Sequence, residues 1–69
     1  MNTFKEANQA KTALKMTLSN YGWFKRADIG SDENGASFCV VVHVSKLDNT
    51  VRKIVPNVFE GVSVKTELE

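Results

Sequence analysis

Cys39 and His43, the single cysteine and the single histidine of the chain, are the residues best suited to nucleophilic chemistry. A cysteine nucleophile needs a base within hydrogen-bond contact. Both residues lie in the stretch 36–45, which we expect to be a strand, and four residues of strand span about 13 Å. A catalytic Cys–His pair is therefore not expected within one chain, and an enzyme of this kind would need a site at a subunit interface.

Metal, cofactor and hydrolytic chemistry find no support elsewhere in the sequence. One cysteine and one histidine are too few for a structural zinc site. Asp32 and Glu33 lie in a polar turn that lacks the repeated oxygen spacing of a calcium loop. The four glycines are scattered, and neither the dinucleotide-binding spacing nor the P-loop spacing occurs. We therefore expect no enzymatic activity, no metal and no cofactor.

The segment Tyr21–Arg26 combines three aromatic rings with two cations. Exposed rings can stack on bases while cations neutralise phosphates. Charge is also uneven, because residues 1–26 carry a net charge of +4 and residues 27–69 a net charge of −3. A nucleic-acid-binding domain is the alternative function, although packing in a core or an interface is the preferred use of the rings. Its residues would be Lys5, Lys11, Lys15, Lys25 and Arg26.

The stretch 36–45 is the one segment apolar enough on both sides to lie in the middle of a sheet. Successive side chains of a strand point to opposite faces. We expect the wholly apolar set to pack against a helix layer and the other set to form an exposed or partner-covered face. The two sets are Phe38, Val40, Val42 and Val44, and Cys39, Val41 and His43.

An amphipathic helix is predicted over residues 3–20. Thr3 and Glu6 have the spacing of a capping box, in which each side chain accepts a hydrogen bond from the backbone of the other residue. Asn20 and Gly22 favour the end of the helix. The inward stripe has helical spacing and consists of Ala7, Ala10, Ala13, Leu14, Thr17, Leu18 and Tyr21.

Residues 23–29 are predicted to form the first strand. Charges on both of its faces are typical of an edge strand. The polar segment 30–35 ends in Asn34-Gly35, which favours a hairpin turn, so we expect antiparallel pairing with the stretch 36–45.

Residues 46–56 allow two interpretations. Asp48 or Asn49 can cap a short helix that Pro56 ends, or residues 50–55 can form a strand after a turn at 47–49. The helix is preferred, because Val51, Ile54 and Val55 match helical spacing. A final strand is predicted over residues 62–67, and its neighbour in the sheet is left open.

The predicted fold is a single α+β domain over residues 1–69. It has two layers and the order α-β-β-α-β, with a three-stranded sheet that contains an antiparallel hairpin and helices on one face. Leu68-Glu69 resembles an expression-tag junction and receives no structural weight. With 42% hydrophobic residues and no continuous apolar run near the N-terminus, the chain is predicted to be a cytoplasmic protein without a membrane segment.

A domain of this size buries only about 60% of the surface that its unfolded chain exposes. Because neither a disulfide nor a zinc site can add stability, we expect self-association, most simply as a homodimer. The predicted function is a non-enzymatic protein–protein interaction or assembly module. The predicted partner-binding residues lie on an exposed sheet face and are Trp23, Lys25, Cys39, Val41 and His43.

Overall fold

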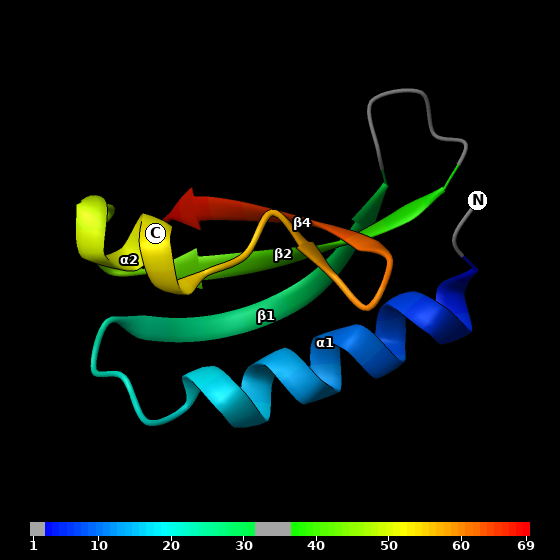
Figure 1. Cartoon of the computed structure of the whole chain (residues 1–69), viewed down its shortest axis with the longest axis horizontal. Coiled ribbons are helices and arrows are strands. Elements are labelled where there is room, and N and C mark those ends of the chain that lie inside the picture. The colour runs from blue at the N-terminus through cyan, green and yellow to red at the C-terminus, as the bar shows by residue number, and fades with distance from the viewer. Residues whose placement is uncertain (1–2, 32–36) are drawn as a thin grey trace.

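The protein is an α+β domain with one long helix packed on a mixed sheet (Figure 1). The computed structural model describes residues 3–31 and 37–69. The elements are α1 (Phe4–Leu18), β1 (Phe24–Ser31), β2 (Phe38–Val44), α2 (Asn49–Ile54), β3 (Val58–Phe59) and β4 (Val62–Leu68). The sheet has four strands in the order β1-β2-β4-β3, so the predicted number of three strands is wrong.

The capping box at the start of α1 is confirmed. The backbone N–H of Glu6 donates to Thr3 Oγ1 (3.2 Å), and the backbone N–H of Thr3 donates to Glu6 Oε1 (2.9 Å). The hydrogen bond from the Thr3 backbone, followed by the one from its hydroxyl, lowers the pKa of Glu6. The helix then runs to Leu18, two residues short of the predicted end.

The predicted hairpin is also confirmed, since β1 and β2 pair antiparallel with Ala27 opposite Val42. β1 continues to Ser31, two residues beyond the predicted strand. The register shifts between Phe24 and Arg26, which identifies a bulge at the start of the strand. The predicted Asn34-Gly35 turn lies outside the described residues.

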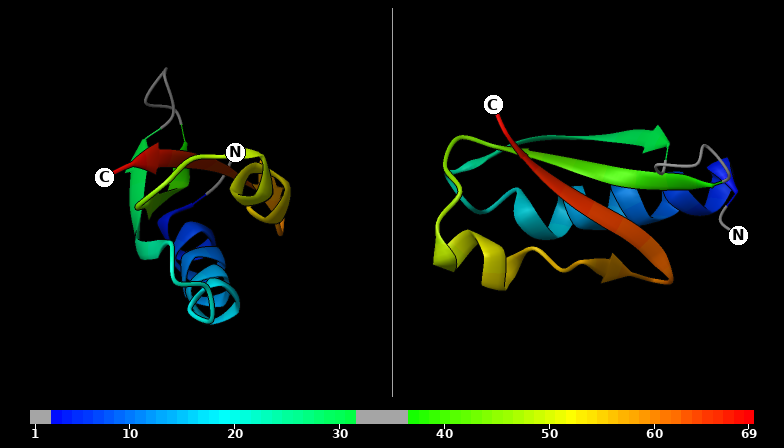
Figure 2. Two further views of the ribbon diagram at one scale, coloured as in Figure 1. Left: turned by 90° about the vertical axis from the view of Figure 1, so that its left-hand side faces the viewer. Right: turned by 90° about the horizontal axis from the view of Figure 1, so that it is seen from above.

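The segment after β2 forms the predicted short helix, so the alternative strand over residues 50–55 is wrong. Asp48 caps α2 by accepting a hydrogen bond from the backbone N–H of Val51 (3.0 Å), and this bond lowers the pKa of Asp48. Val51 and Val55 are buried in the same core as the inward face of α1. Figure 2 shows α2 on the same side of the sheet as α1.

The sequence prediction omitted β3 and left the position of β4 open. β4 lies beside β2 and runs parallel to it, with Thr66 opposite Val42. β3 pairs antiparallel with the start of β4 through a two-residue turn at Glu60 and Gly61, whose φ angles are 52° and 77°. Both positive φ angles are typical of a tight hairpin turn.

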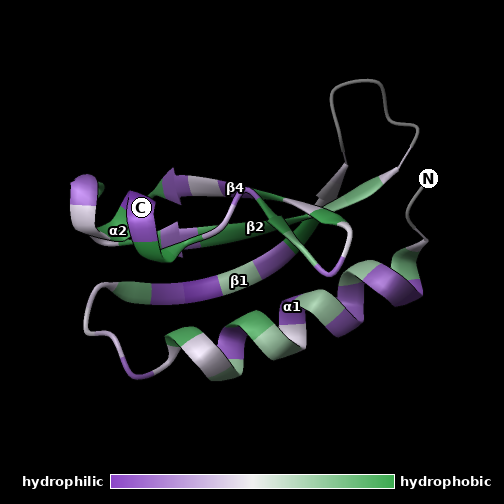
Figure 3. Ribbon diagram, viewed as in Figure 1, coloured by the Kyte–Doolittle hydropathy of each residue, from purple (hydrophilic) through white to green (hydrophobic). Residues whose placement is uncertain are grey.

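The core lies between one face of the sheet and the helices. Val40, Val42 and Val44 are fully buried there, together with Leu14 and Leu18 of α1. Figure 3 shows β2 as hydrophobic over most of its length, between a more hydrophilic β1 and β4. The predicted central position of this strand is therefore confirmed.

Candidate functional site

The sheet face turned away from the helices, which we call the open face, carries three of the five predicted partner-binding residues. The cross-strand registers and the alternation of side chains place them there beside residues of β1 and β4. The open face consists of Arg26, Asp28 and Gly30, of Cys39, Val41 and His43, and of Lys65 and Glu67.

Trp23 and Lys25 do not share the open face. Trp23 precedes β1, is only 8% exposed and belongs to the core, where its ring stacks on Tyr21 with the ring centroids 4.9 Å apart. Lys25 lies at the bulge. The prediction placed Trp23 on the exposed face of the sheet, whereas Trp23 and Ala27 both lie in the core.

Cys39 and Val41 are buried within one chain even though they lie outside the main core. A Cβ atom added at Gly30 would lie 3.1 Å from Cγ2 of Val41 and 3.7 Å from Sγ of Cys39, so both side chains occupy the space over this glycine. The Cys39 thiol also donates to the backbone oxygen of Ser31 (3.7 Å). These two residues therefore offer little surface to a partner.

Four side chains form an ionic cluster at one end of the open face: Arg26, Asp28, His43 and Glu69. Nε2 of His43 lies 3.2 Å from Asp28, and its Nδ1 lies 3.7 Å from Glu69. Nε of Arg26 lies 3.6 Å from Asp28 and 3.3 Å from Glu69. Leu68-Glu69, which the prediction set aside, is thus part of the fold, because Leu68 also pairs with Val44.

The Cys39 thiol and the His43 ring have different partners. Cys39 donates to the backbone oxygen of Ser31, whereas the ring nitrogens of His43 lie beside Asp28 and Glu69. Within residues 3–31 and 37–69, no group of three Cys, His, Asp or Glu side chains is placed to hold a metal ion.

The residues of the nucleic-acid alternative lie on two elements. Lys5, Lys11 and Lys15 are on α1, whereas Lys25 and Arg26 are on β1. Arg26 is engaged in the ionic cluster. Of the aromatic rings in the Tyr21–Arg26 segment, Trp23 is buried and Phe24 packs against the core. Nucleic-acid binding stays a prediction.

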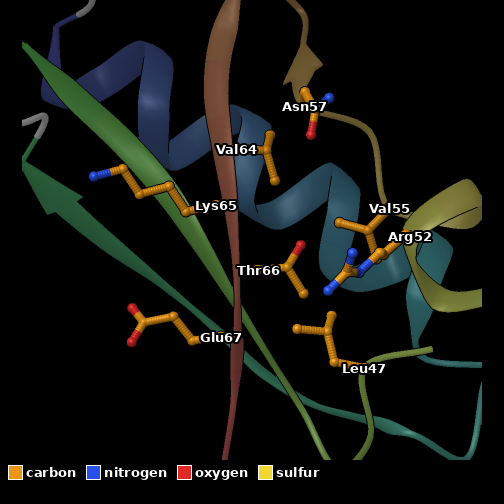
Figure 4. A pocket seen from close by; sticks show the side chains of 8 residues that line it. All are labelled: Leu47, Arg52, Val55, Asn57, Val64, Lys65, Thr66 and Glu67. Carbon is orange, nitrogen blue, oxygen red and sulfur yellow. The ribbon is translucent and has the colours of Figure 1, made fainter. Parts of the chain in front are cut away.

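A hollow of about 640 Å³ lies beside β4, at a place where the sequence predicted no site (Figure 4). Four of the lining residues are consecutive in β4, from Val64 to Glu67. Their side chains alternate between the two faces of the sheet. The hollow therefore follows the edge of the strand rather than one face. Its other wall comes from α2 and the segments around it: Leu47, Arg52, Val55 and Asn57.

Backbone groups of β4 face this hollow. The N–H of Glu69 donates to Val44 of β2 (2.8 Å), whereas the N–H of Val64 points the other way and donates to Asn57 (2.8 Å). Because backbone groups alternate in direction along a strand, those of Val64, Thr66 and Leu68 point away from β2.

β3 covers the edge of β4 only beside Val62 and Ser63. Past the N–H of Val64, no neighbouring strand within the described part of the chain pairs with that side of β4. We call Val64–Leu68 the open edge. Sequence patterns did not reveal it, because an edge is defined by the neighbours that a strand lacks.

No protein-family model matches the chain, and neither a curated protein nor a solved structure matches it. No helix among residues 3–31 and 37–69 is long and apolar enough to cross a membrane.

Proposed function

We propose that this chain is a small non-enzymatic protein-interaction module that binds an extended segment of a protein as an added strand at the open edge of β4. Strand addition supplies affinity through backbone hydrogen bonds and specificity through pockets beside the strand. The observation that carries the proposal is that the outward backbone groups of Thr66 and Leu68, and the carbonyl group of Val64, have no backbone partner among the described residues and lie next to a hollow with a defined lining.

The dimensions suit a short segment. Five residues of strand extend over about 16 Å, which gives room for three to five residues of an added strand. Natural proteins usually protect sheet edges against pairing, so an uncovered edge in such a small domain needs a reason. A binding role supplies that reason.

The hollow also offers contacts for the side chains of such a segment. Leu47 and Val55 provide apolar surface on the wall opposite β4. Figure 4 shows the guanidinium group of Arg52 pointing into the hollow from the same wall. No ion pair within the described residues includes Arg52, so its charge is free to meet an acidic side chain.

The open edge supports binding better than the sheet face that the sequence predicted. On that face Cys39 and Val41 are buried, and His43 lies between two carboxylates with only 16% of its side chain exposed. A partner placed there would meet mainly charged groups that already have partners. We therefore move the proposed binding surface from the face to the edge.

Selection from a displayed library of random nine-residue peptides tests this function. Thr66→Pro removes an outward N–H without removing a hydrogen bond to β2, whereas Thr66→Val keeps both the N–H and the branched shape. We expect selected peptides to bind the wild-type chain and Thr66→Val equally and Thr66→Pro at least about tenfold more weakly, since strand addition depends on backbone hydrogen bonds. Equal binding to all three chains, or recovery of no binding peptide, would contradict the proposal.

A further inference from the structure

The residues of the open edge complement a second copy of themselves. When two open edges run antiparallel about Thr66, Thr66 faces its own counterpart, Lys65 faces Glu67 of the second copy, and Val64 faces its Leu68. We infer that the open edge pairs with the open edge of a second copy in this register, so that two sheets join into one around a twofold axis. The inference rests on the proposed function, because it names the occupant of that edge.

The backbone groups meet correctly in this arrangement. Residues that direct both backbone groups outward must face one another in an antiparallel pair. Thr66 is such a residue, so the two copies exchange hydrogen bonds between their Thr66 backbones. The N–H of Leu68 meets the free carbonyl oxygen of Val64 in the second copy, and the N–H of Val64 stays with Asn57.

The side chains match on both faces of the joined sheet. On the open face Lys65 meets Glu67 twice, and neither residue takes part in an ion pair within the described chain. On the helix side Val64 meets Leu68 twice. Leu68 is 63% exposed in a single chain, so pairing would remove apolar surface from water.

Charge selects this register from the alternatives. Within the open edge, outward residues also face one another when the axis passes through residue 65 or residue 67. These registers place Lys65 opposite Lys65, or Glu67 opposite Glu67. Like charges directly opposite one another destabilise a strand pair. Only the axis at Thr66 pairs opposite charges without also placing two like charges opposite one another.

No neighbouring strand among the described residues covers the edge of β4 beside Thr66 and Leu68. β3 covers β4 at Val62 and Ser63, Asn57 accepts a hydrogen bond from the N–H of Val64, and the inferred pairing begins at the carbonyl group of Val64. α2 lies on the helix side of the sheet and does not continue the sheet beyond the open edge (Figure 2). The uncovered part of β4, from the carbonyl group of Val64 to Leu68, therefore lies within its self-complementary part.

Exchange of the two charges tests the inference in the full chain. We expect a wild-type dimer in sedimentation equilibrium, and dissociation constants raised about tenfold by Lys65→Glu or by Glu67→Lys, because each change places like charges opposite one another twice. The double variant Lys65→Glu/Glu67→Lys should return to within about threefold of wild type. Circular dichroism of each variant checks that the fold is retained.

Mixing the two single variants gives the sharpest result. A Lys65→Glu chain has two acidic residues at the edge and a Glu67→Lys chain has two basic ones, so the pair should form a heterodimer tighter than either homodimer. A wild-type monomer at millimolar concentration would overturn the inference. So would a dimer that neither single variant weakens, or single variants that form no heterodimer.

These outcomes are distinct from a failure of the proposed function. A wild-type monomer that still binds selected peptides, and loses them on Thr66→Pro, would leave the binding edge in place and remove only the second copy as its occupant. A monomer that also binds no peptide would overturn both.

Discussion

The sheet has two edges, one formed by β1 and the other by β3 together with the second half of β4. β1 begins with a bulge at Lys25, and charged Arg26 and Asp28 follow. Bulges and charges both discourage pairing with another chain. β4 has a regular register from residue 64 to residue 68, with no bulge, and only its first two residues are covered by β3.

The charges on the two edges act differently: those on β1 discourage pairing with another chain, and those on the open edge can direct it. Along β1, irregular geometry adds to the charges, and Arg26 and Asp28 are partners of one another within the chain. Along the open edge, Lys65 and Glu67 have no ion-pair partner among the described residues. We interpret the edge at β1 as protected against pairing, and the open edge of β4 as one whose charges determine which strand can pair with it.

The largest expected effect is a difference in stability between proline substitutions on the two sides of β4, the side that faces β2 and the side that faces away from it. Lys65 directs its backbone groups toward β2, so Lys65→Pro removes a buried hydrogen bond and should lower the free energy of unfolding by about 2 kcal/mol. Thr66→Pro changes the outward side and should lower it by less than about 1 kcal/mol, by the same reasoning. Urea denaturation at low protein concentration measures both. Equal losses would show that Thr66 does not belong to an uncovered edge.

A smaller effect is expected where β3 turns back to cover β4. Gly61 has a φ of 77°, a conformation that alanine adopts only with strain. Gly61→Ala should therefore lower the free energy of unfolding by about 1 kcal/mol.

Gly22→Ala is the matched control for this turn. A Cβ atom at Gly22 would meet no atom within 4 Å, and the residue has no positive φ. Urea denaturation should find the Gly22 variant within about 0.5 kcal/mol of wild type, as for surface changes in general. If both variants lose the same stability, the turn at Gly61 does not hold β3 in place.

The smallest expected effect is one of pH on the caps of the two helices. Hydrogen bonds from Thr3 and from Val51 lower the pKa of Glu6 and of Asp48 in the folded chain. Each carboxylate therefore adds stability that is present above its unfolded pKa and is lost as pH falls through its folded pKa. The urea concentration at the midpoint of unfolding should decrease as the pH is lowered from 5 to 3, and this decrease should be smaller for Glu6→Gln. An unchanged slope would contradict this account of the α1 cap.

Local signals allowed much of the fold to be predicted. The Thr3–Glu6 capping box and the cap at Asp48 depend on residues close in sequence, and the structure contains both. The predicted faces of the stretch 36–45 are confirmed for Val40, Val42 and Val44, which lie in the core, whereas Phe38 is exposed, and Cys39 and Val41 on the opposite face are buried. β3 was missed because two residues are too few to show a period.

The binding edge could not be predicted for a different reason. The position of β4 is decided by packing between residues far apart in the chain, such as Val40 with Val64. Likewise, charges on both sides of residues 23–29 hid which face of β1 is buried, and Trp23 was placed on the wrong side. Without the neighbours of each strand, neither the open edge nor the ionic cluster follows from residue types.

Gly30 has a consequence for the evolution of this sequence. Because a Cβ atom at this position would lie only 3.1 Å from Cγ2 of Val41, the two sites are sterically coupled across the strand pair. We expect substitutions there to be accepted in a fixed order, with a smaller residue at 41 before any side chain at 30. Positions 30 and 41 should then change together among diverged descendants, as an epistatic pair.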